Sequence, residues 1–404
     1  MKKILVFCLF FIFLFPYQVF SLSEFEKFKL QQQEEYSSYR KTVKGGFKKY
    51  KKELKEAFNN YQKQVSTVWG KKDAVMPDKK VWVQYRKDMK ERNIVDFEKG
   101  KATIEVAISP EDAKDKDKLA KNIEQAIEKT VEAKPDKRSI VDIAKHPSKI
   151  KEDKSKPTLL ANQVRDNKGK PVTKKNVKKF ALNLLKKKKV KIKEVKGEDG
   201  KKRIVASISF DLVPNHLRVR AKKYEKRVLK ESVKRKLPPK LVFAIMETES
   251  AFNPSAKSPI PAFGLMQLVP VSGGRDAYRF VHGKNEAPTD QYLYNPDNNV
   301  ELGSAFLHIL YYRYLKGVKN GVSRLWCTIA SYNTGVGNLY NSFAGKYSRK
   351  RFKSRKVWKK KALAKINSMS SEGIYDHLIH QLTYEETRNY VKKVRKRMPK
   401  YTLK

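Results

Sequence analysis

The sequence predicts an α+β protein that ends in an all-α domain. Three observations favour this class: an apolar stripe with helical spacing near the N-terminus, alternating strand and helix patterns in the middle, and only helical patterns after residue 214. A chain of 404 residues with 40% apolar residues is long enough for two or three domains with cores of their own. The expected divisions are 1–21 for an export signal, 22–68 for a long amphipathic helix, 69–213 for an α+β domain that includes a Lys-rich linker, and 214–404 for the all-α domain.

The N-terminus has the pattern of an export signal. Lys2 and Lys3 precede the apolar run 4–15, and the small or branched residues that signal peptidase requires end at Ser21. An uncleaved membrane anchor is the alternative, but the run is shorter than the ~20 residues of a spanning helix. Cys8 lies in the middle of the run and not at a lipidation site. We therefore expect an exported protein of the periplasm or cell envelope without a lipid anchor, with association with the outer membrane as an open alternative.

Residues 36–68 consist of three units of eleven residues, YSSYRKTVKGG, FKKYKKELKEA and FNNYQKQVSTV. Eleven residues make three turns of about 3.67, so the apolar positions form an almost straight stripe along one helix. The stripe comprises Tyr36, Tyr39, Val43, Phe47, Tyr50, Leu54, Phe58, Tyr61 and Val65. Two interpretations remain open: the stripe packs against the protein itself, or it lies on an anionic membrane through residues 22–68. Gly45 and Gly46 weaken the membrane interpretation because each costs ~1 kcal/mol in a helix.

The middle of the chain reads as a small α+β domain. KVWVQY, NIVDFEKGKATIEVAI and RIVASISFDLV alternate as strands do, with a turn at Lys99–Gly100, and EDAKDKDKLAKNIEQAIEKTVEA has helical spacing. From about Lys134 to Pro157 the chain is rich in Lys, Asp and Pro and has little periodicity, which predicts a linker.

One helix of the C-terminal domain carries two carboxylates, Glu247 and Glu249, after the apolar run LVFAIM. A helix that begins at Pro238–Pro239 places Glu249 on the face of Ile245, and Glu247 points away by about 200°. Because the run is apolar all round, we expect burial, and the negative end of the helix dipole lies nearby. Both effects raise the pKa of a carboxyl group, as a general acid needs. The alternative from spacing alone is a solvated or capping glutamate.

Three ordered motifs decide between these alternatives. ESAFNPSAKSPIPAFGLMQLVP, SYNTGVGN and ETRNYV resemble the catalytic domain of the lytic murein transglycosylases, whose fold is all-α and similar to goose lysozyme. Upstream, WGKKDAVMPDKKVWVQYRKDMKERNIVDFEKGKATIEVA and VPNHL resemble the N-terminal region of a membrane-bound branch of that family. Members of that branch are lipoproteins. Because this chain lacks the lipidation cysteine, the resemblance does not imply a lipid anchor here.

The resemblance implies a site built around Glu249 as the catalytic acid and base. The residues that it implies for supporting the acid or binding the glycan are Ser258, Gly264, Leu265, Met266, Gln267, Tyr332, Asn333 and Tyr390. Tyr hydroxyls can orient the acid or stabilise positive charge, and amide side chains can hold acetamido groups. SYNTG stands where the family usually has AYNAG, which changes small positions but removes no reactive group.

The implied reaction is non-hydrolytic cleavage of the MurNAc–GlcNAc β-1,4 bond of peptidoglycan, giving 1,6-anhydromuramyl products. Asp297 and Glu301 remain candidates for a second carboxylate, but no motif places them opposite Glu249. The alternatives are a lysozyme-type muramidase and an inactive protein that binds the cell wall or a membrane.

The composition adds a demand for anionic partners. With 91 Lys plus Arg against 42 Asp plus Glu, the net charge is +49. Peptidoglycan strands and an anionic membrane fit an exported protein, whereas nucleic acid is opposed by the export signal. The six histidines show no metal-ligand pattern, so no metal and no cofactor are expected.

Overall fold

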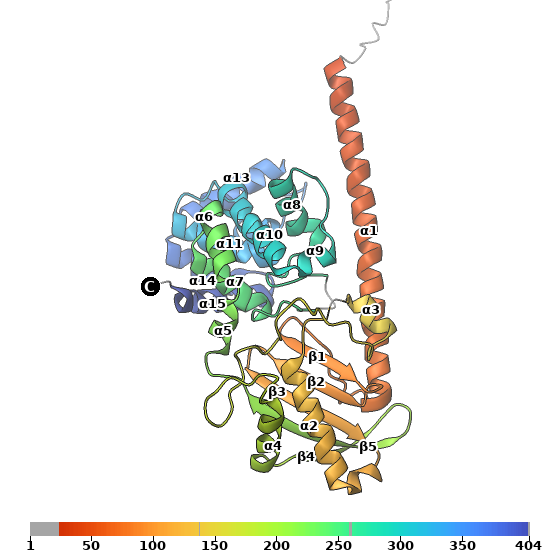
Figure 1. Cartoon of the computed structure of the whole chain (residues 1–404). Helices are drawn as coiled ribbons and strands as arrows, with labels where there is room; N and C mark the ends of the chain where they lie inside the picture. The colour runs from red at the N-terminus through yellow and green to blue at the C-terminus, as the bar shows by residue number, and fades with distance from the viewer. Residues whose placement is uncertain (1–23, 137, 258–260, 403–404) are drawn as a thin grey trace, which may run out of the picture. The chain divides into compact units, whose positions relative to one another are not determined.

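The computed structural model describes residues 24–136, 138–257 and 261–402, without the side chains of 24–44 and 47 (Figure 1). The chain divides into two units, residues 1–49 and 50–404. The first helix, α1 (Glu24–Trp69), runs through the boundary between them. Within the described ranges no helix is both long enough and apolar enough to span a bilayer. The predicted export signal lies outside the described residues.

Residues 70–213, the sheet domain, are built on a five-stranded antiparallel sheet with the order β1-β2-β3-β5-β4. The strands are β1 (Val81–Arg86), β2 (Glu91–Asp96), β3 (Lys101–Ile108), β4 (Lys191–Lys196) and β5 (Lys202–Asp211). All three predicted strand segments are confirmed. The additional strand β4, with the sequence KIKEVK, lies at the edge of the sheet and is mostly exposed. Charged edges of this kind oppose pairing with another sheet.

The predicted turn between β2 and β3 is a contact point with the rest of the protein. Gly100 has φ +69, and a Cβ there would come within 2.5 Å of His216 Nε2. Asp96 Oδ1 accepts hydrogen bonds from the backbone N–H groups of Glu98 and Lys99, at 3.0 and 2.9 Å. Only glycine combines this backbone conformation with so close an approach.

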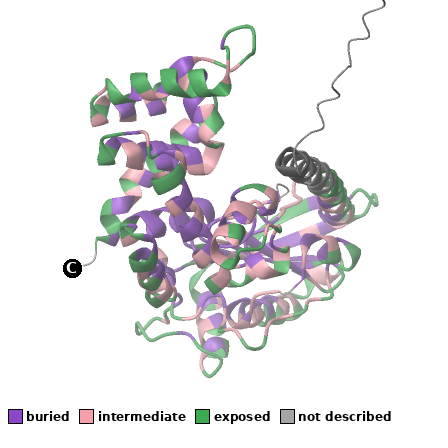
Figure 2. Ribbon diagram, turned by 90° about the horizontal axis from the view of Figure 1, so that it is seen from above, coloured by how far each residue is buried: buried purple, intermediate pink, exposed green. Residues whose placement is uncertain are grey.

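Helices cover both faces of the sheet. On one face, α2 (Lys116–Glu132) and α4 (Val177–Lys187) pack against alternate strand residues such as Ile104 and Val106. The other face, which includes Val205, is covered by the end of α1 and by α3 (Ile140–Lys145). The short helix η1 (Asp112–Lys114) precedes α2. Figure 2 shows the buried residues gathered along the sheet and the inner sides of its helices.

The described half of the apolar stripe is part of this core. Leu54, Tyr61 and Val65 are buried, Tyr50 and Phe58 are partly buried, and all five pack against sheet-domain or neighbouring residues. For this half, the packing interpretation is confirmed and the membrane interpretation is wrong, because the stripe already has an apolar partner. The side chains of Tyr36, Tyr39, Val43 and Phe47 lie outside the description.

The predicted linker from Lys134 to Pro157 is wrong. Ile140 and Ile143 are buried in the sheet-domain core, and α3 begins with a capping box between Ser139 and Asp142. Arg138 is buried with its guanidinium on Asp136, at 2.6 Å. Low periodicity reflected a short helix between turns, each held by local side-chain caps, and not an absence of packing.

Residues 214–402, the helical domain, contain only helices and short connections in their described part, as predicted. The elements are α5 (His216–Lys222), α6 (Glu225–Arg235), α7 (Pro239–Ser250), η2 (Pro270–Gly274), α8 (Arg275–His282), α9 (Asp290–Tyr294), α10 (Pro296–His308), η3 (Ile309–Tyr314), α11 (Gly321–Thr334), α12 (Val336–Ala344), α13 (Arg355–Asn367), α14 (Ser371–Gln381), α15 (Glu385–Arg397) and η4 (Met398–Tyr401). Its core surrounds α7, and Cys327 is fully buried within it.

We expect Leu54→Ala to lower the free energy of unfolding by about 2–5 kcal/mol, because it empties a buried position without changing helix propensity. Leu182→Ala is the matched control, since Leu182 on α4 is 42% exposed. Urea denaturation of both variants measures the difference. Equal stability of the two variants would show that α1 does not pack on the sheet.

Candidate active site

The site is built on the end of α7. Pro238 caps the helix and Pro239 occupies its first turn, where the missing N–H costs no hydrogen bond. Every residue from 241 to 250 is buried, as an all-round apolar helix requires. The helix stops at Ala251 and Phe252, two consecutive non-glycine residues with φ of 48° and 59°. Such left-handed positions persist only where surrounding contacts hold them.

The contact that holds this helix end is Arg220 on α5. Its guanidinium donates to the carbonyl of Ala251 (2.9 Å), to Gln163 Oε1 (2.6 Å) and to the carbonyl of Phe97 in the β2–β3 turn. Burial lowers the pKa of Arg220 to about 10, so the group remains charged at neutral pH. Arg220 therefore joins the end of α7 to two segments of the sheet domain.

Glu249 is a buried carboxyl group, with 7% of its surface exposed. Burial raises its pKa to about 7; Lys79, Tyr390 and Lys80 oppose the shift, and Glu386 adds to it. The sequence analysis predicted a desolvated carboxyl group at this position, and Glu249 is buried in the structure. At neutral pH a substantial fraction of Glu249 carries a proton that it can donate.

Two tyrosines from separate motifs lie against Glu249. Tyr390 on α15 is buried beside the carboxyl group, and its burial, followed by the charge of Glu249, raises the pKa of the tyrosine well above its usual value. Tyr332 on α11 is partly buried near Glu249, and its hydroxyl donates to the carbonyl of Met266 at 2.8 Å. Both hydroxyl groups therefore stay protonated.

The turn from Gly264 to Gln267 is held by a residue that the sequence analysis missed. Asn299 on α10 accepts from the N–H of Met266 (2.8 Å) and donates to the carbonyl of Leu293 (2.9 Å). Gly264 has φ +74, and a Cβ there would lie 2.3 Å from Asn299 Nδ2. No signal in the sequence marks Asn299, because its partners are 6 to 36 positions away.

Of the four residues in this turn, only the side chain of Gln267 is accessible to a glycan. Leu265 and Met266 have no exposed surface, because their side chains fill the core beside α7. Gln267 is partly exposed, with Nε2 donating to the carbonyl of Gly264 at 2.9 Å. Leu265 and Met266 thus hold the turn in place, and Gln267 is available to a ligand.

The remaining predicted residues divide as follows. Asn333 accepts from the hydroxyl of Thr387 at 2.7 Å, which ties the second motif to the third. Ser258 lies outside the described residues.

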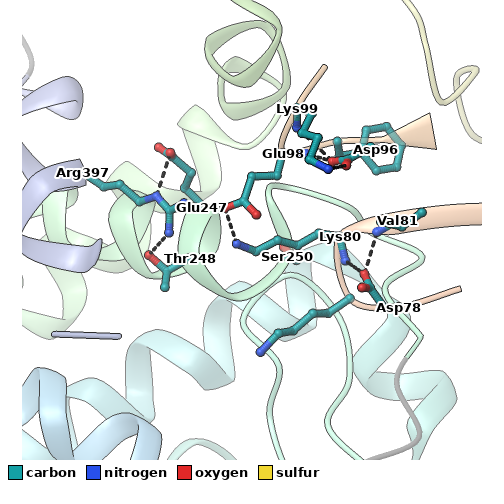
Figure 3. A network of polar contacts seen from close by, with 12 residues as sticks. Asp78, Lys80, Val81, Asp96, Glu98, Lys99, Glu247, Thr248, Ser250 and Arg397 are labelled. Atoms are coloured by element: carbon teal, nitrogen blue, oxygen red, sulfur yellow. Dashed lines mark hydrogen bonds and ion pairs between the residues drawn. The ribbon is translucent and has the colours of Figure 1, made fainter. Parts of the chain in front are cut away.

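Glu247 does not face water, although it does point away from Glu249. It is 2% exposed and accepts from Arg397 Nε at 2.9 Å (Figure 3). It also accepts from Lys400 Nζ (3.0 Å) and the Tyr401 hydroxyl (2.6 Å). Glu247 points away from Glu249, as predicted, and it is a buried residue with hydrogen-bond partners of its own. Its position 200° from Glu249 turns it toward the C-terminal segment, which supplies three donors.

Neither proposed second carboxylate is opposite Glu249. Glu301 pairs with Arg227 at 3.2 Å and with Lys234 at 3.8 Å. Asp297 is in the first turn of α10 and lines a cavity of about 580 Å³ between the domains, which does not include Glu249. The carboxylate whose charge raises the pKa of Glu249 is Glu386. Its place in the motif ETRNYV, one helical turn before Tyr390, could have identified it from the sequence.

No group of three or more His, Cys, Asp or Glu side chains among the described residues could hold a metal ion. The site combines a carboxyl group that can donate and accept a proton with two protonated tyrosines, which is suited to acid–base catalysis.

Comparisons with known proteins match this architecture. A family model of the transglycosylase SLT domain matches residues 227–354, and one of the N-terminal domain of membrane-bound lytic murein transglycosylase C matches residues 47–223. Proteins named membrane-bound lytic murein transglycosylase C from Yersinia pestis and Yersinia pseudotuberculosis are 32% identical over 338 residues, 83% of this chain and 86% of theirs.

Solved structures of soluble lytic transglycosylases are more distant. The enzyme from Pseudomonas aeruginosa is 24% identical over 43% of this chain and 23% of its own, with a TM-score of 0.31. The 70 kDa enzyme from Escherichia coli is 23% identical over 42% and 22%, with a TM-score of 0.30.

The match to the SLT domain and the similarity to these relatives define the class of protein, a peptidoglycan lyase. The chain belongs to the membrane-bound lytic murein transglycosylase C family, and it is a lytic transglycosylase whose substrate is peptidoglycan.

We expect Glu247→Gln to lower the free energy of unfolding by about 3 kcal/mol, because it leaves Arg397 buried beside a neutral partner. Glu372→Gln is the control: its pair with Arg395 joins side chains that are 65% and 39% exposed, so its loss should cost less than about 1 kcal/mol. Thermal and urea denaturation give both values. If the two variants lose equal stability, the buried contacts of Glu247 do not stabilise the fold.

Proposed function

We propose that this chain cleaves the MurNAc–GlcNAc β-1,4 bond of peptidoglycan without water, with Glu249 as both acid and base. The observation that carries the assignment is a buried carboxyl group at the end of α7 with a pKa of about 7. A group with that pKa can give up a proton and take one back near neutral pH.

The reaction needs one carboxyl group. Glu249 protonates the oxygen that bridges the two sugars, and the bond from this oxygen to C1 of the muramyl residue breaks. The carbonyl oxygen of the substrate's own N-acetyl group stabilises C1. The Glu249 carboxylate then removes the proton of the C6 hydroxyl, whose oxygen bonds to C1. The product is a 1,6-anhydromuramyl end, and Glu249 is protonated again.

The neighbouring residues have supporting roles in this proposal. The Tyr390 and Tyr332 hydroxyls stay protonated, so they can orient the Glu249 carboxyl group and stabilise the oxocarbenium-like charge. The partly exposed amide groups of Gln267 and Asn333 are suited to hydrogen bonds with acetamido groups. Ser258 is proposed as a hydrogen-bonding partner near Glu249 from the resemblance of its motif.

A muramidase is the second candidate, and Glu386 is the observation that favours it. A hydrolase needs a second carboxylate to activate water or form a covalent intermediate. Glu386 acts on Glu249, but its side chain is 73% exposed and pairs with Lys79 at 3.8 Å. The two reactions differ in product, because hydrolysis gives a reducing end and transglycosylation gives an anhydro end.

We expect the activity on purified sacculi to fall as pH rises through about 7, because the acid form of Glu249 is lost there. The charged and titratable groups that face this carboxyl are Lys79, Lys80, Tyr390, Tyr332 and Glu386. Mass spectrometry of the released muropeptides should find anhydro ends. Reducing ends would support the muramidase instead.

The control is Glu249→Gln, which should lose roughly 10²–10⁴-fold of the activity at every pH. The raised pKa also means that ionisation of Glu249 destabilises the folded state as pH rises from its unfolded value of about 4.5 towards 7. Glu249→Gln should therefore be at least as stable as the unsubstituted chain at pH 8. Retained activity in a folded Glu249→Gln variant would contradict the assignment.

We infer a location in the cell envelope, after export directed by residues 1–21. Relatives are named membrane-bound, and a net charge of +49 suits the carboxylates of peptidoglycan and anionic headgroups. Nucleic acid is not a proposed partner, because an exported protein does not meet it. Residues from Tyr50 onward pack in the core, so a membrane contact of the N-terminal helix is proposed for residues 22–49 alone.

We expect binding to purified sacculi to fall steeply between low and high salt and to be unchanged by deletion of residues 22–49. Screening over roughly 8 Å at physiological ionic strength weakens charge pairing but not apolar contact. Binding to anionic vesicles should keep a salt-resistant part that this deletion removes. Co-sedimentation measures both; complete loss of vesicle binding in high salt would exclude the membrane contact.

A further inference from the structure

The sheet domain places a lysine beside the catalytic carboxyl group. Lys79 lies two residues before β1, far in sequence from the motifs of the helical domain. Among the charged neighbours of Glu249, its ammonium group has the largest effect on the carboxyl group. Lys79 also pairs with Glu386 of α15 at 3.8 Å, so the lysine faces both carboxylates of the site.

The backbone around Lys79 is fixed on both sides. Asp78 Oδ1 accepts from the N–H groups of Lys80 (2.6 Å) and Val81 (2.7 Å), which forms a tight turn (Figure 3). The carbonyl of Lys79 accepts from Asn253 Nδ2 at 3.4 Å, and Asn253 follows the end of α7. The base of the Lys79 side chain is therefore anchored beside the helix that carries Glu249.

A chain of ion pairs secures the same turn to α7. Lys80 Nζ donates to Glu98 Oε1 at 2.6 Å, and Arg397 Nη2 donates to the same oxygen at 2.7 Å (Figure 3). Arg397 in turn binds Glu247 at 2.9 Å and the hydroxyl of Thr248 at 2.9 Å, both on α7. The side chain of Lys80 is therefore held within this chain of ion pairs, and that of Lys79 is not part of it.

The side chain of Lys79 is free to change partner. It is 40% exposed, and Glu386 is 73% exposed, so their ion pair at 3.8 Å is a surface pair. Such pairs contribute little free energy, and an incoming anion can replace one member at low cost. A partly exposed ammonium group on a fixed backbone is suited to bind a carboxylate of the substrate.

The substrate carries carboxylates close to the bond that breaks. Each muramyl residue has a lactyl group, which is either a free carboxylate or joined by an amide to a stem peptide with carboxylates of its own. In either form a negative charge lies within a few bonds of the sugar that Glu249 attacks.

We propose that Lys79 of the sheet domain binds a carboxylate of the muramyl substituent and thereby helps to select and position the glycan at Glu249. This inference rests on the proposed function, because it assumes that the muramyl residue lies at Glu249. It assigns the sheet domain a direct part in substrate binding.

The test combines a variant of the protein with a chemical change of the substrate. On native sacculi we expect Lys79→Gln to lower kcat/KM by roughly five- to tenfold, the size of one charge-assisted contact. On sacculi whose carboxylates have been amidated with carbodiimide and ammonia, Lys79→Gln and the unsubstituted chain should be equally active. Lys79→Arg should recover most of the activity on native sacculi.

The matched control is Lys71→Gln, another exposed sheet-domain lysine, which pairs with Glu198 at 3.4 Å. It should leave kcat/KM unchanged on both substrates. Glycan strands stripped of peptide by an amidase identify the source of the charge: a larger loss in Lys79→Gln on stripped strands indicates the lactyl carboxylate, and a larger loss on peptide-bearing strands indicates the stem peptide.

The proposal is overturned if Lys79→Gln behaves like Lys71→Gln on native sacculi. It is also overturned if Lys79→Gln loses the same factor on native and amidated sacculi, since that loss would come from the changed charge around Glu249 and not from the substrate. Failure of the proposed function is a separate result, because the unsubstituted chain would then release no anhydro product from any of the substrates.

Discussion

The buried guanidinium group of Arg220 is the contact on which the site depends. It binds the carbonyl of Ala251 at the end of α7, and it binds Gln163 and the carbonyl of Phe97 in the sheet domain. A helix that ends on two left-handed non-glycine residues is costly, and the carbonyl groups of its last turn need donors. Arg220 supplies donors to three segments at once, and with them it fixes where Glu249 lies.

The site concentrates features that oppose stability. Glu249 is an acid held in a buried place that raises its pKa to about 7, and Ala251 and Phe252 occupy strained backbone positions. Both are costs to the fold that a catalytic site commonly carries. The packed core around α7 and the ion pairs of Glu247 with Arg397 and Lys400 offset them. Two carboxylates on one helix therefore differ in role: Glu247 is structural, and Glu249 is the one that we propose as the acid.

The sheet domain is more than an attachment to the helical domain. Its β2–β3 turn receives Arg220 and Arg397, and its turn before β1 brings Lys79 and Lys80 to the charged surroundings of Glu249. Gly100 is needed because the imidazole of His216 packs directly on this turn. Both domains therefore determine the electrostatic surroundings of Glu249. Without Lys79 and Lys80 of the sheet domain, the pKa of Glu249 would be higher.

The sequence by itself determined the periodic and the local features. The eleven-residue stripe, the alternating strands, the all-round apolar α7 and the three motifs identified the fold class and the central position of Glu249, because each is encoded within a few turns of chain. The tertiary structure alone decided the partners. Glu247 meets Arg397 across 150 positions, and Arg220 meets Phe97 across 123. A segment without periodicity, 134–157, proved to be packed because its contacts are caps and buried ion pairs. Periodicity reports which face of an element is apolar, whereas a hydrogen bond or ion pair between distant residues depends on the path of the whole chain.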